Sequence, residues 1–161
     1  MRHILNQPKI KQIGISEVQF GKDVTIVNPV NLYGCVIGNN VFIGPFVEIQ
    51  KDVTIGDRTK IQSHSFICEL VDIGKDCFVA HGVTFINDLF ENDGPAKGDR
   101  SLWKQTKIGD NVSIGSNTTI LPVEVCSNVV IGAGSVVTKD IKEPGIYAGN
   151  PIHLIKALSN Y

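Results

Sequence analysis

Hydrophobic side chains recur at every sixth position along most of the chain. From residue 37 onward these positions carry only apolar residues, namely Ile37, Ile43, Ile49, Ile55, Ile61, Ile67, Ile73, Val79 and Phe85. Small or β-branched side chains stand four residues after nearly all of them, and Gly, Asn, Asp and Lys dominate the positions between. A six-residue interval fits neither the alternation of a strand nor the 3.6-residue period of a helix. It predicts a short strand followed by a tight turn, repeated many times.

Such a unit cannot bury its own apolar side chain, so the units must stack on one another. The spacing extends upstream to Phe20 and resumes downstream from Ile108 to Val137, with one residue missing between Ile120 and Val125. Stacked parallel rungs about 4.8 Å apart would place the apolar columns inside and the turns outside. We therefore predict an all-β fold, a parallel β-helix with three hexads per coil. Neither the triangular section nor the handedness follows from the spacing alone.

The pattern is interrupted once, over the polar segment "NDLFENDGPAKGDRSLWKQTK". A segment of this length cannot enter the coil, so we expect a projecting loop at about residues 87–107. Long ordered loops frequently carry functional sites, although a tolerated surface insertion is the alternative. We expect one domain over residues 1–161, ending in a short C-terminal tail at about residues 143–161.

Composition and charge exclude several classes of partner. The chain has 15 basic and 16 acidic residues, whereas nucleic acids and anionic membranes select basic surfaces. No apolar run approaches the roughly 20 residues of a membrane span, and the start "MRHILNQPKI" lacks the apolar stretch of a signal peptide. We therefore expect a cytoplasmic protein. The four cysteines show no metal-binding spacing and are interpreted as free thiols.

Two histidines and an asparagine lie where the hexads meet the loop. His81 and Asn87 both occupy the third position of a hexad, which places them at successive corners of one coil. A residue three full hexads before His81 would lie at the same corner one coil away. His64 stands one position after that residue, so it is expected near the same corner. A cluster of Ser63, His64 and His81 is therefore plausible.

The segments "IGNNVFIGPFVEIQKDVTIGDRTKIQ" and "IGDNVSIGSNTTI…NVVIGAGSVVTKDI" resemble the hexapeptide-repeat acyltransferases over about residues 20–155. The resemblance implies a left-handed β-helix, a homotrimer and acetyl-CoA (coenzyme A) as co-substrate. "IQSHSFICE…FVAHGVTFIND" is similar to the subgroup that N-acetylates nucleotide-linked 3-amino sugars, with dTDP- or UDP-linked acceptors. These enzymes serve surface-polysaccharide pathways, including O-antigen and lipopolysaccharide biosynthesis.

The resemblance also implies roles for individual residues near the loop. His81 is the candidate general base, although a corner histidine that caps a turn is the alternative. Asn87 would orient the amine or a sugar hydroxyl, and Asp88, the subgroup's next residue, would bind substrate unless it is a turn residue. His64 and Trp103 complete the substrate-binding set. The subgroup's aromatic-Pro-Arg stretch is replaced by residues 89–92, "LFEN", which favours a neutral deoxyhexose over an acidic sugar.

For coenzyme A, the resemblance indicates the C-terminal coils. The matching positions are Gly115, Ser116, Ala133, Gly134, Lys139, Asn150, Pro151 and Lys156. Small residues allow a pantetheine chain to approach the backbone closely, although turn geometry alone would also select glycine.

Three other readings of the same sequence remain open. No metal site is expected, because a γ-class carbonic anhydrase would pair His81 with a histidine at position 86, which is isoleucine. A non-catalytic β-helix scaffold is a second alternative. Acetylation of a non-nucleotide acceptor such as serine or a galactoside is a third.

Overall fold

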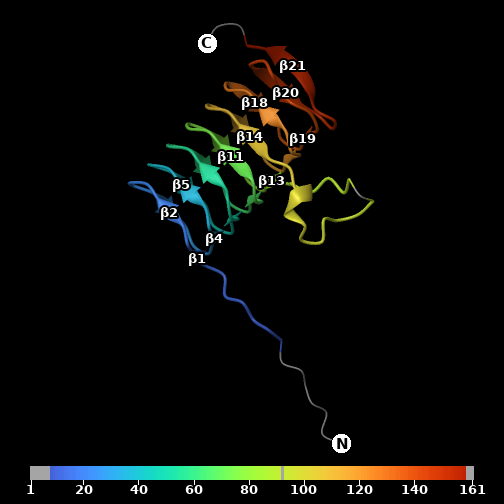
Figure 1. The fold of residues 1–161 in the computed structure, drawn as a ribbon. Coiled ribbons are helices and arrows are strands. Elements are labelled where there is room, and N and C mark those ends of the chain that lie inside the picture. Colours follow the sequence, from blue (N-terminus) through green and yellow to red (C-terminus); the bar gives the residue numbers. More distant parts are fainter. Residues whose placement is uncertain (1–7, 92, 159–161) are drawn as a thin grey trace, which may run out of the picture.

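The computed structural model describes residues 8–91 and 93–158, and its strands form a single parallel β-solenoid, consistent with a left-handed β-helix. The coils succeed one another along one axis, from blue to red in Figure 1. The coils contribute one short strand to each of three sheets, as the hexad pattern predicts, except that the last coil meets sheet B only at the bridge between Val125 and Ile141. The regular structure of the described residues is almost entirely β-strand.

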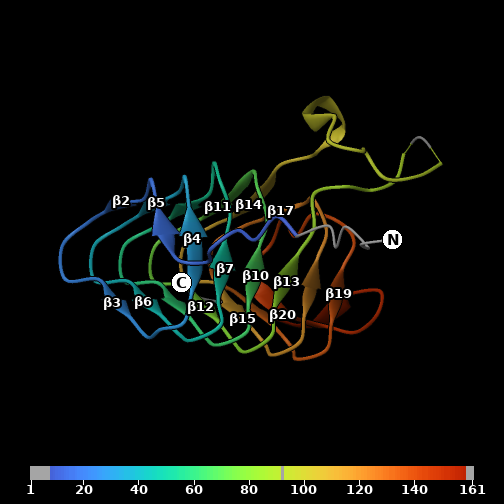
Figure 2. The same ribbon diagram turned by 90° about the horizontal axis from the view of Figure 1, so that it is seen from below.

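The three sheets, named A, B and C in the order in which the chain visits them, are the faces of the solenoid (Figure 2). Sheet A contains β1 (Ile15–Ser16), β4 (Asn31–Tyr33), β7 (Glu48–Ile49), β10 (Phe66–Ile67), β13 (Thr84–Phe85), β16 (Thr119–Ile120) and β19 (Val136–Val137). Sheet B contains β2 (Gln19–Phe20), β5 (Val36–Ile37), β8 (Thr54–Ile55), β11 (Val71–Ile73), β14 (Thr106–Ile108) and β17 (Glu124–Val125). Sheet C contains β3 (Thr25–Ile26), β6 (Phe42–Ile43), β9 (Lys60–Ile61), β12 (Phe78–Val79), β15 (Ser113–Ile114), β18 (Val129–Ile131), β20 (Gly145–Ala148) and β21 (His153–Ala157).

The predicted apolar columns are the core. In sheet C, Ile43 pairs with Ile61 and Ile61 with Val79, and all three side chains are fully buried. Successive members of this column are separated in the sequence by three full hexads. Where the sequence lacks one residue, the step shortens by one position, so that Ile120 pairs with Val137 and the column continues without a break.

The corners between the sheets carry the predicted turn chemistry. At the corner between sheets B and C the left-handed positions hold Asp23, Asn40, Arg58, Asp76, Asn111 and Asn128, with φ between 54° and 63°. The glycines that follow the core isoleucines serve a different purpose, because their φ is not positive. A Cβ on Gly56 would lie 2.5 Å from the carbonyl carbon of Gly74 in the next coil, so close coil stacking requires glycine there.

The predicted loop leaves the coil after β13 and returns at β14, at the corner between sheets A and B. It projects from the solenoid and contains a single 3-10 turn, η1 (Arg100–Leu102), drawn in yellow in Figures 1 and 2. Asp99 caps this turn by accepting a hydrogen bond from the backbone N–H of Ser101.

The expected tail is more regular than the sequence indicates. β20 continues sheet C in parallel with β18, and β21 then folds back antiparallel on β20. The chain therefore closes its last coil with a hairpin. Residues 159–161, the end of the expected tail, lie outside the described residues.

The cysteines are free, and Cys35, Cys68 and Cys77 are buried. Burial raises the pKa of the Cys35 thiol to about 11 and that of the Cys68 thiol to about 12. Within the described ranges there is no helix of the length and hydropathy that a membrane crossing would need.

Candidate functional site

The turns between sheets C and A stack into one ridge parallel to the solenoid axis. We call it the His81 ridge and define it by the residue pairs 45–46, 63–64, 81–82, 116–117 and 133–134. Backbone hydrogen bonds join successive members: the N–H of His64 donates to Pro45, that of Gly82 to Ser63, and that of Asn117 to His81. The predicted placement of His64 and His81 at one corner is therefore confirmed.

A direct side-chain contact links two coils on this ridge. Ser63 Oγ lies 2.9 Å from His81 Nδ1. His81 is exposed on the single chain, so a substrate can reach its ring. When Nδ1 donates to the serine oxygen, Nε2 carries the lone pair that a general base requires. The contact thus orients the imidazole in the way an acid–base role demands.

The ridge continues past His81 toward the C-terminus as a line of small residues. Gly115 and Ser116 lie one coil further on, followed by Ala133 and Gly134. The turn of residues 149–151 continues this line, because the N–H of Val136 donates to Gly149 and that of Ile152 to Val136. Six of the eight residues predicted for coenzyme A therefore lie along one line with His81.

The other two predicted cofactor residues lie elsewhere. Lys139 is exposed at the corner between sheets A and B, and Lys156 is exposed on β21. Gly115 also has a packing reason to be glycine, because a Cβ there would lie 2.4 Å from the backbone nitrogen of Ala133. Its presence is explained by coil stacking whether or not a ligand binds.

The loop forms a second candidate region at the next corner. A cleft of about 230 Å³ lies between the loop and the outer face of sheet A and is lined by Gln50, Phe66, Cys68, Phe85, Ile86, Asn87, Asp88, Phe90 and Trp103. It brings together three of the predicted site residues, Asn87, Asp88 and Trp103. The sequence interpretation missed Phe66 and Gln50, since both belong to hexads that precede the loop by one or two coils.

The contacts of Asn87 and Asp88 differ. Asn87 Nδ2 donates to the carbonyl of Glu69 at 3.2 Å, so the amide stacks on the coil below, and its oxygen accepts no hydrogen bond from the residues that the structure describes. Asp88 Oδ1 accepts from the N–H of Phe90 at 3.0 Å, and Oδ2 accepts from the N–H of Ala96 at 2.7 Å. Both oxygens of Asp88 therefore organise the loop backbone, as expected for the turn-residue alternative.

A charged anchor holds the loop against the solenoid. The Arg100 guanidinium lies 2.6 Å from Asp52 and 2.7 Å from Glu69, on two successive coils. Glu69 Oε2 is buried and makes no directional hydrogen bond, so its contact with Arg100 is mainly electrostatic. Arg100 also lies 5.8 Å from the centre of the Trp103 ring, within cation–π range. The anchor thus positions the indole that lines the cleft.

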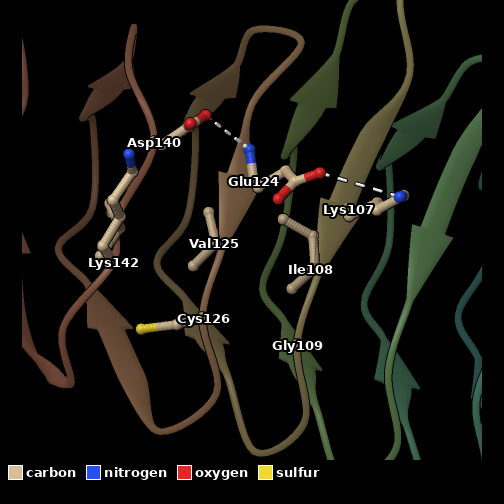
Figure 3. Close-up of a pocket in the computed structure, with 9 residues that line it drawn as sticks. Lys107, Ile108, Gly109, Glu124, Val125, Cys126, Asp140 and Lys142 are labelled. Carbon is tan, nitrogen blue, oxygen red and sulfur yellow. Dashed lines mark hydrogen bonds and ion pairs between the residues drawn. The ribbon is translucent and has the colours of Figure 1, made fainter.

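Another cleft, of about 430 Å³, lies at the C-terminal end of sheet B (Figure 3). Lys107 lies 3.7 Å from Glu124 in this cleft, and Asp140 accepts a hydrogen bond from the backbone N–H of Glu124 at 2.9 Å. Cys126 also faces it. None of the predicted site residues lines this cleft, and we assign it no part in the chemistry.

The part of the chain that the structure describes contains no group of three or more His, Cys, Asp or Glu residues arranged to hold a metal ion.

Comparison with known families places this geometry in context. Residues 34–69 match the bacterial transferase hexapeptide family (six repeats), and residues 105–139 match the hexapeptide repeat of succinyl-transferase. These segments therefore carry hexapeptide repeats of the kind that the two transferase families share. The two matched segments lie on either side of the inserted loop and contain four of the five residue pairs of the His81 ridge, whereas residues 81–82 lie between the matches.

Curated relatives of this hexapeptide-repeat protein include the bifunctional protein GlmU of Acetivibrio thermocellus, 40% identical over 111 residues. GlmU of Clostridium botulinum strain Kyoto is 39% identical over 108 residues. These alignments cover 68% and 66% of this chain but only 22% and 21% of the relatives. The chain therefore spans about a fifth of the length of these proteins.

Solved structures align over more of their length. A mutant of AntD, an N-acyltransferase from Bacillus cereus in complex with dTDP and coenzyme A, is 25% identical with a TM-score of 0.70, covering 91% of this chain and 85% of that one. A maltose O-acetyltransferase from Clostridium difficile 630 is 28% identical with a TM-score of 0.56, covering 88% and 71%. The acetyl-CoA complex of the Vibrio cholerae acetyltransferase VCA0836, at 21% identity and a TM-score of 0.65 over 79% and 72%, shows the shared fold alone.

Proposed function

We propose that the protein transfers an acetyl group from acetyl-CoA to the amino group of a nucleotide-linked 3-amino sugar. The observation that carries the proposal is the Ser63–His81 pair, because it places an oriented imidazole in line with the small-residue path on the same ridge. The similarity to AntD, whose structure holds both dTDP and coenzyme A, supports a nucleotide-linked acceptor and a coenzyme A donor.

The donor would lie along the C-terminal half of the His81 ridge. Side chains there project little, so a pantetheine chain could approach the backbone of Gly115, Ser116, Ala133 and Gly134 closely. Asn150 and Pro151 extend this path beyond the last full coil. Lys156, exposed on β21, would contact the phosphates, and Lys139, also predicted for coenzyme A, is exposed at the other corner.

In the reaction the amine nitrogen attacks the thioester carbonyl carbon, a C–N bond forms, and the C–S bond breaks. His81 Nε2 would accept the proton that leaves the nitrogen and return it to the departing thiolate, which leaves as the free thiol of coenzyme A. Ser63 would hold the ring in the required orientation. Backbone N–H groups at the turns of the ridge are the simplest donors for the developing oxyanion.

The acceptor would be bound by the loop side of the site. Asn87, whose amide oxygen is not used in the contact with Glu69, would orient the amine or a sugar hydroxyl. Trp103 and Phe66 offer apolar surface to a sugar ring. His64 would lie beside the general base His81, and Asp88 organises the loop backbone around these residues. The absence of an arginine from residues 89–92 favours an uncharged deoxyhexose.

A second subunit would complete this site. His81 and the loop cleft lie at different corners of sheet A on one chain, and His81 is exposed there. A neighbouring solenoid packed against the ridge would exclude water and bring its own loop toward the base. We therefore propose a homotrimer, acting in the cytoplasm on precursors of surface polysaccharides. A stable monomer in analytical ultracentrifugation would contradict the shared site.

The proposal is tested with a panel of dTDP- and UDP-linked 3-amino and 4-amino sugars, following thiol release from acetyl-CoA. We expect turnover with one or more 3-amino members. His81→Asn should lower kcat by about 100-fold or more, with the KM for acetyl-CoA within about twofold, since general bases contribute roughly 10²- to 10⁴-fold. A normal kcat would assign His81 to turn capping. Asn87→Ala should lower turnover with the fold intact by circular dichroism.

Acetylation of a sugar hydroxyl without a nucleotide is the second candidate, favoured by the 28% identity to the maltose O-acetyltransferase. Thiol release with maltose or a galactoside, and none with any sugar nucleotide, would support it over the first proposal. A protein that binds neither acetyl-CoA nor any acceptor would instead be a scaffold.

A further inference from the structure

The His81 ridge departs from ordinary corner chemistry on the N-terminal side of the base. The left-handed positions of the corner between sheets B and C hold asparagine, aspartate and arginine, whereas this ridge carries Phe46 with φ 60° and His64 with φ 63°. Bulky residues rarely adopt this conformation, and each such residue costs about 1–3 kcal/mol. Such strain retained in a regular fold points to a function that needs the side chains at that place.

The two rings form a stack that faces outward. Their centroids lie 4.8 Å apart with planes inclined by 29°, an offset arrangement typical of favourable aromatic pairs. Phe46 nevertheless keeps 56% of its surface exposed. The stack adds nothing to the packing of the apolar columns, because neither Phe46 nor His64 is among the buried residues of the core.

A cleft of about 210 Å³ adjoins the exposed ring and is lined by Phe46 together with Ile13, Pro29, Asn31 and Glu48 among others. Asn31 Oδ1 accepts a long contact of 3.4 Å from the N–H of Gly14, and among the described residues its Nδ2 has no hydrogen-bond partner. Glu48 Oε1 accepts a hydrogen bond from Gln50 at 2.9 Å, and a carboxylate has further acceptor capacity. The cleft thus presents a flat apolar surface beside one donor and one acceptor.

We propose that Phe46, supported by His64, is the stacking platform for the pyrimidine base of the acceptor nucleotide. Thymine and uracil present adjacent C=O and N–H groups, which match the Asn31 amide and the Glu48 carboxylate. This inference rests on the proposed function and deepens it by naming where the nucleoside binds.

The position along the axis fits this assignment. Phe46 lies two coils before His81, which corresponds to about 10 Å at the rung spacing of a parallel sheet. An extended nucleoside diphosphate sugar is longer than that, so its base can rest on Phe46 while its sugar reaches His81. The small-residue path for the donor leaves His81 in the opposite direction, which keeps the two substrates apart.

The test is the affinity of the full-length protein for dTDP, UDP, coenzyme A and pyrophosphate, measured by calorimetry. Phe46→Gly removes the ring and relieves the strained conformation, so the fold is retained. We expect dTDP or UDP to bind about 5- to 100-fold more weakly, the range for loss of one base–aromatic stack. Coenzyme A and pyrophosphate should be unaffected. Phe46→Tyr keeps an aromatic ring and should bind dTDP and UDP with the wild-type affinity. Asp23→Gly, which also introduces glycine at an exposed corner residue, here with φ 55°, should leave all four affinities unchanged.

Unchanged dTDP and UDP affinity in Phe46→Gly would overturn the platform while leaving acetyl transfer intact. Weakened binding of coenzyme A alone would assign the ring to the adenine of the donor and also overturn it. Loss of nucleotide binding together with dissociation of the oligomer in sedimentation would assign Phe46 to a subunit interface instead. If the wild-type protein binds neither dTDP nor UDP but still acetylates free sugars, the nucleotide part of the proposed function fails as well.

Discussion

Replacement of Ile61 by alanine tests the packing on which the whole solenoid depends. Ile61 is fully buried at the middle of sheet C, between Ile43 in the coil before and Val79 in the coil after. Ile61→Ala removes three methyl or methylene groups, about 2.4 kcal/mol at roughly 0.8 kcal/mol per group. The cavity left in a rigid column raises the loss of unfolding free energy to about 3–4 kcal/mol, inside the range of roughly 2–5 kcal/mol known for such changes.

The loss is measured by urea unfolding at fixed protein concentration, because oligomers show concentration-dependent stability. Lys60→Ala is the matched control: Lys60 is the neighbouring residue on β9, its side chain faces solvent, and its replacement should change the unfolding free energy by less than about 0.5 kcal/mol. Equal effects of the two substitutions, or a loss for Ile61→Ala well below the roughly 2 kcal/mol lower bound of such changes, would refute an internal isoleucine column.

Two further changes probe the loop and the thiols. Arg100→Gln removes the ion pairs with Asp52 and Glu69, so proteolysis within the loop should be several-fold faster while the unfolding midpoint of the solenoid stays within error; an unchanged cleavage rate would show that the loop does not need this anchor. In native protein at pH 8, a maleimide should label Cys126 first, because burial raises the pKa of the Cys68 thiol to about 12 and keeps it protonated until the pH approaches that value. Labelling that persists in Cys126→Ser would contradict this order.

The solenoid could be predicted from the sequence because each coil buries its apolar side chains in the same way as the next. A six-residue interval buries Ile43, Ile61 and their equivalents only when the hexads stack, and with three hexads per coil the register follows from counting hexads. The residue that is missing between Ile120 and Val125 changes the strand register accordingly. Ile120 pairs with Val137, one position short of three hexads. His64 and His81 share a corner for the same reason.

The loop could not be predicted in the same way, since its contacts depend on the fold of the rest of the chain. The pairing of Arg100 with Asp52 and Glu69 joins residues that lie far apart in the sequence and that no local pattern connects. Asp88 stands at the expected place, but its carboxylate is occupied by the loop backbone. The sequence also indicated a plain tail where the structure has a hairpin.

The candidate site was predictable in its residue types and only partly in its geometry. The spacing predicted that Ser63 lies near His81, as found, and the resemblance indicated the small residues that continue the same ridge. The aromatic pair of Phe46 and His64 was missed, because a hexad pattern does not reveal which corner residue is strained. The signal was present as a phenylalanine at a turn position that holds Asn, Asp or Gly in most other hexads.

The most direct test of acetyl transfer to a sugar amine compares two forms of one sugar nucleotide, carrying either an amino or a hydroxyl group at C3. With acetyl-CoA and the wild-type protein, the account predicts stoichiometric thiol release and a monoacetylated product only from the amino form. Acetylation of the hydroxyl form at a similar rate, or no thiol release with either form, would contradict it.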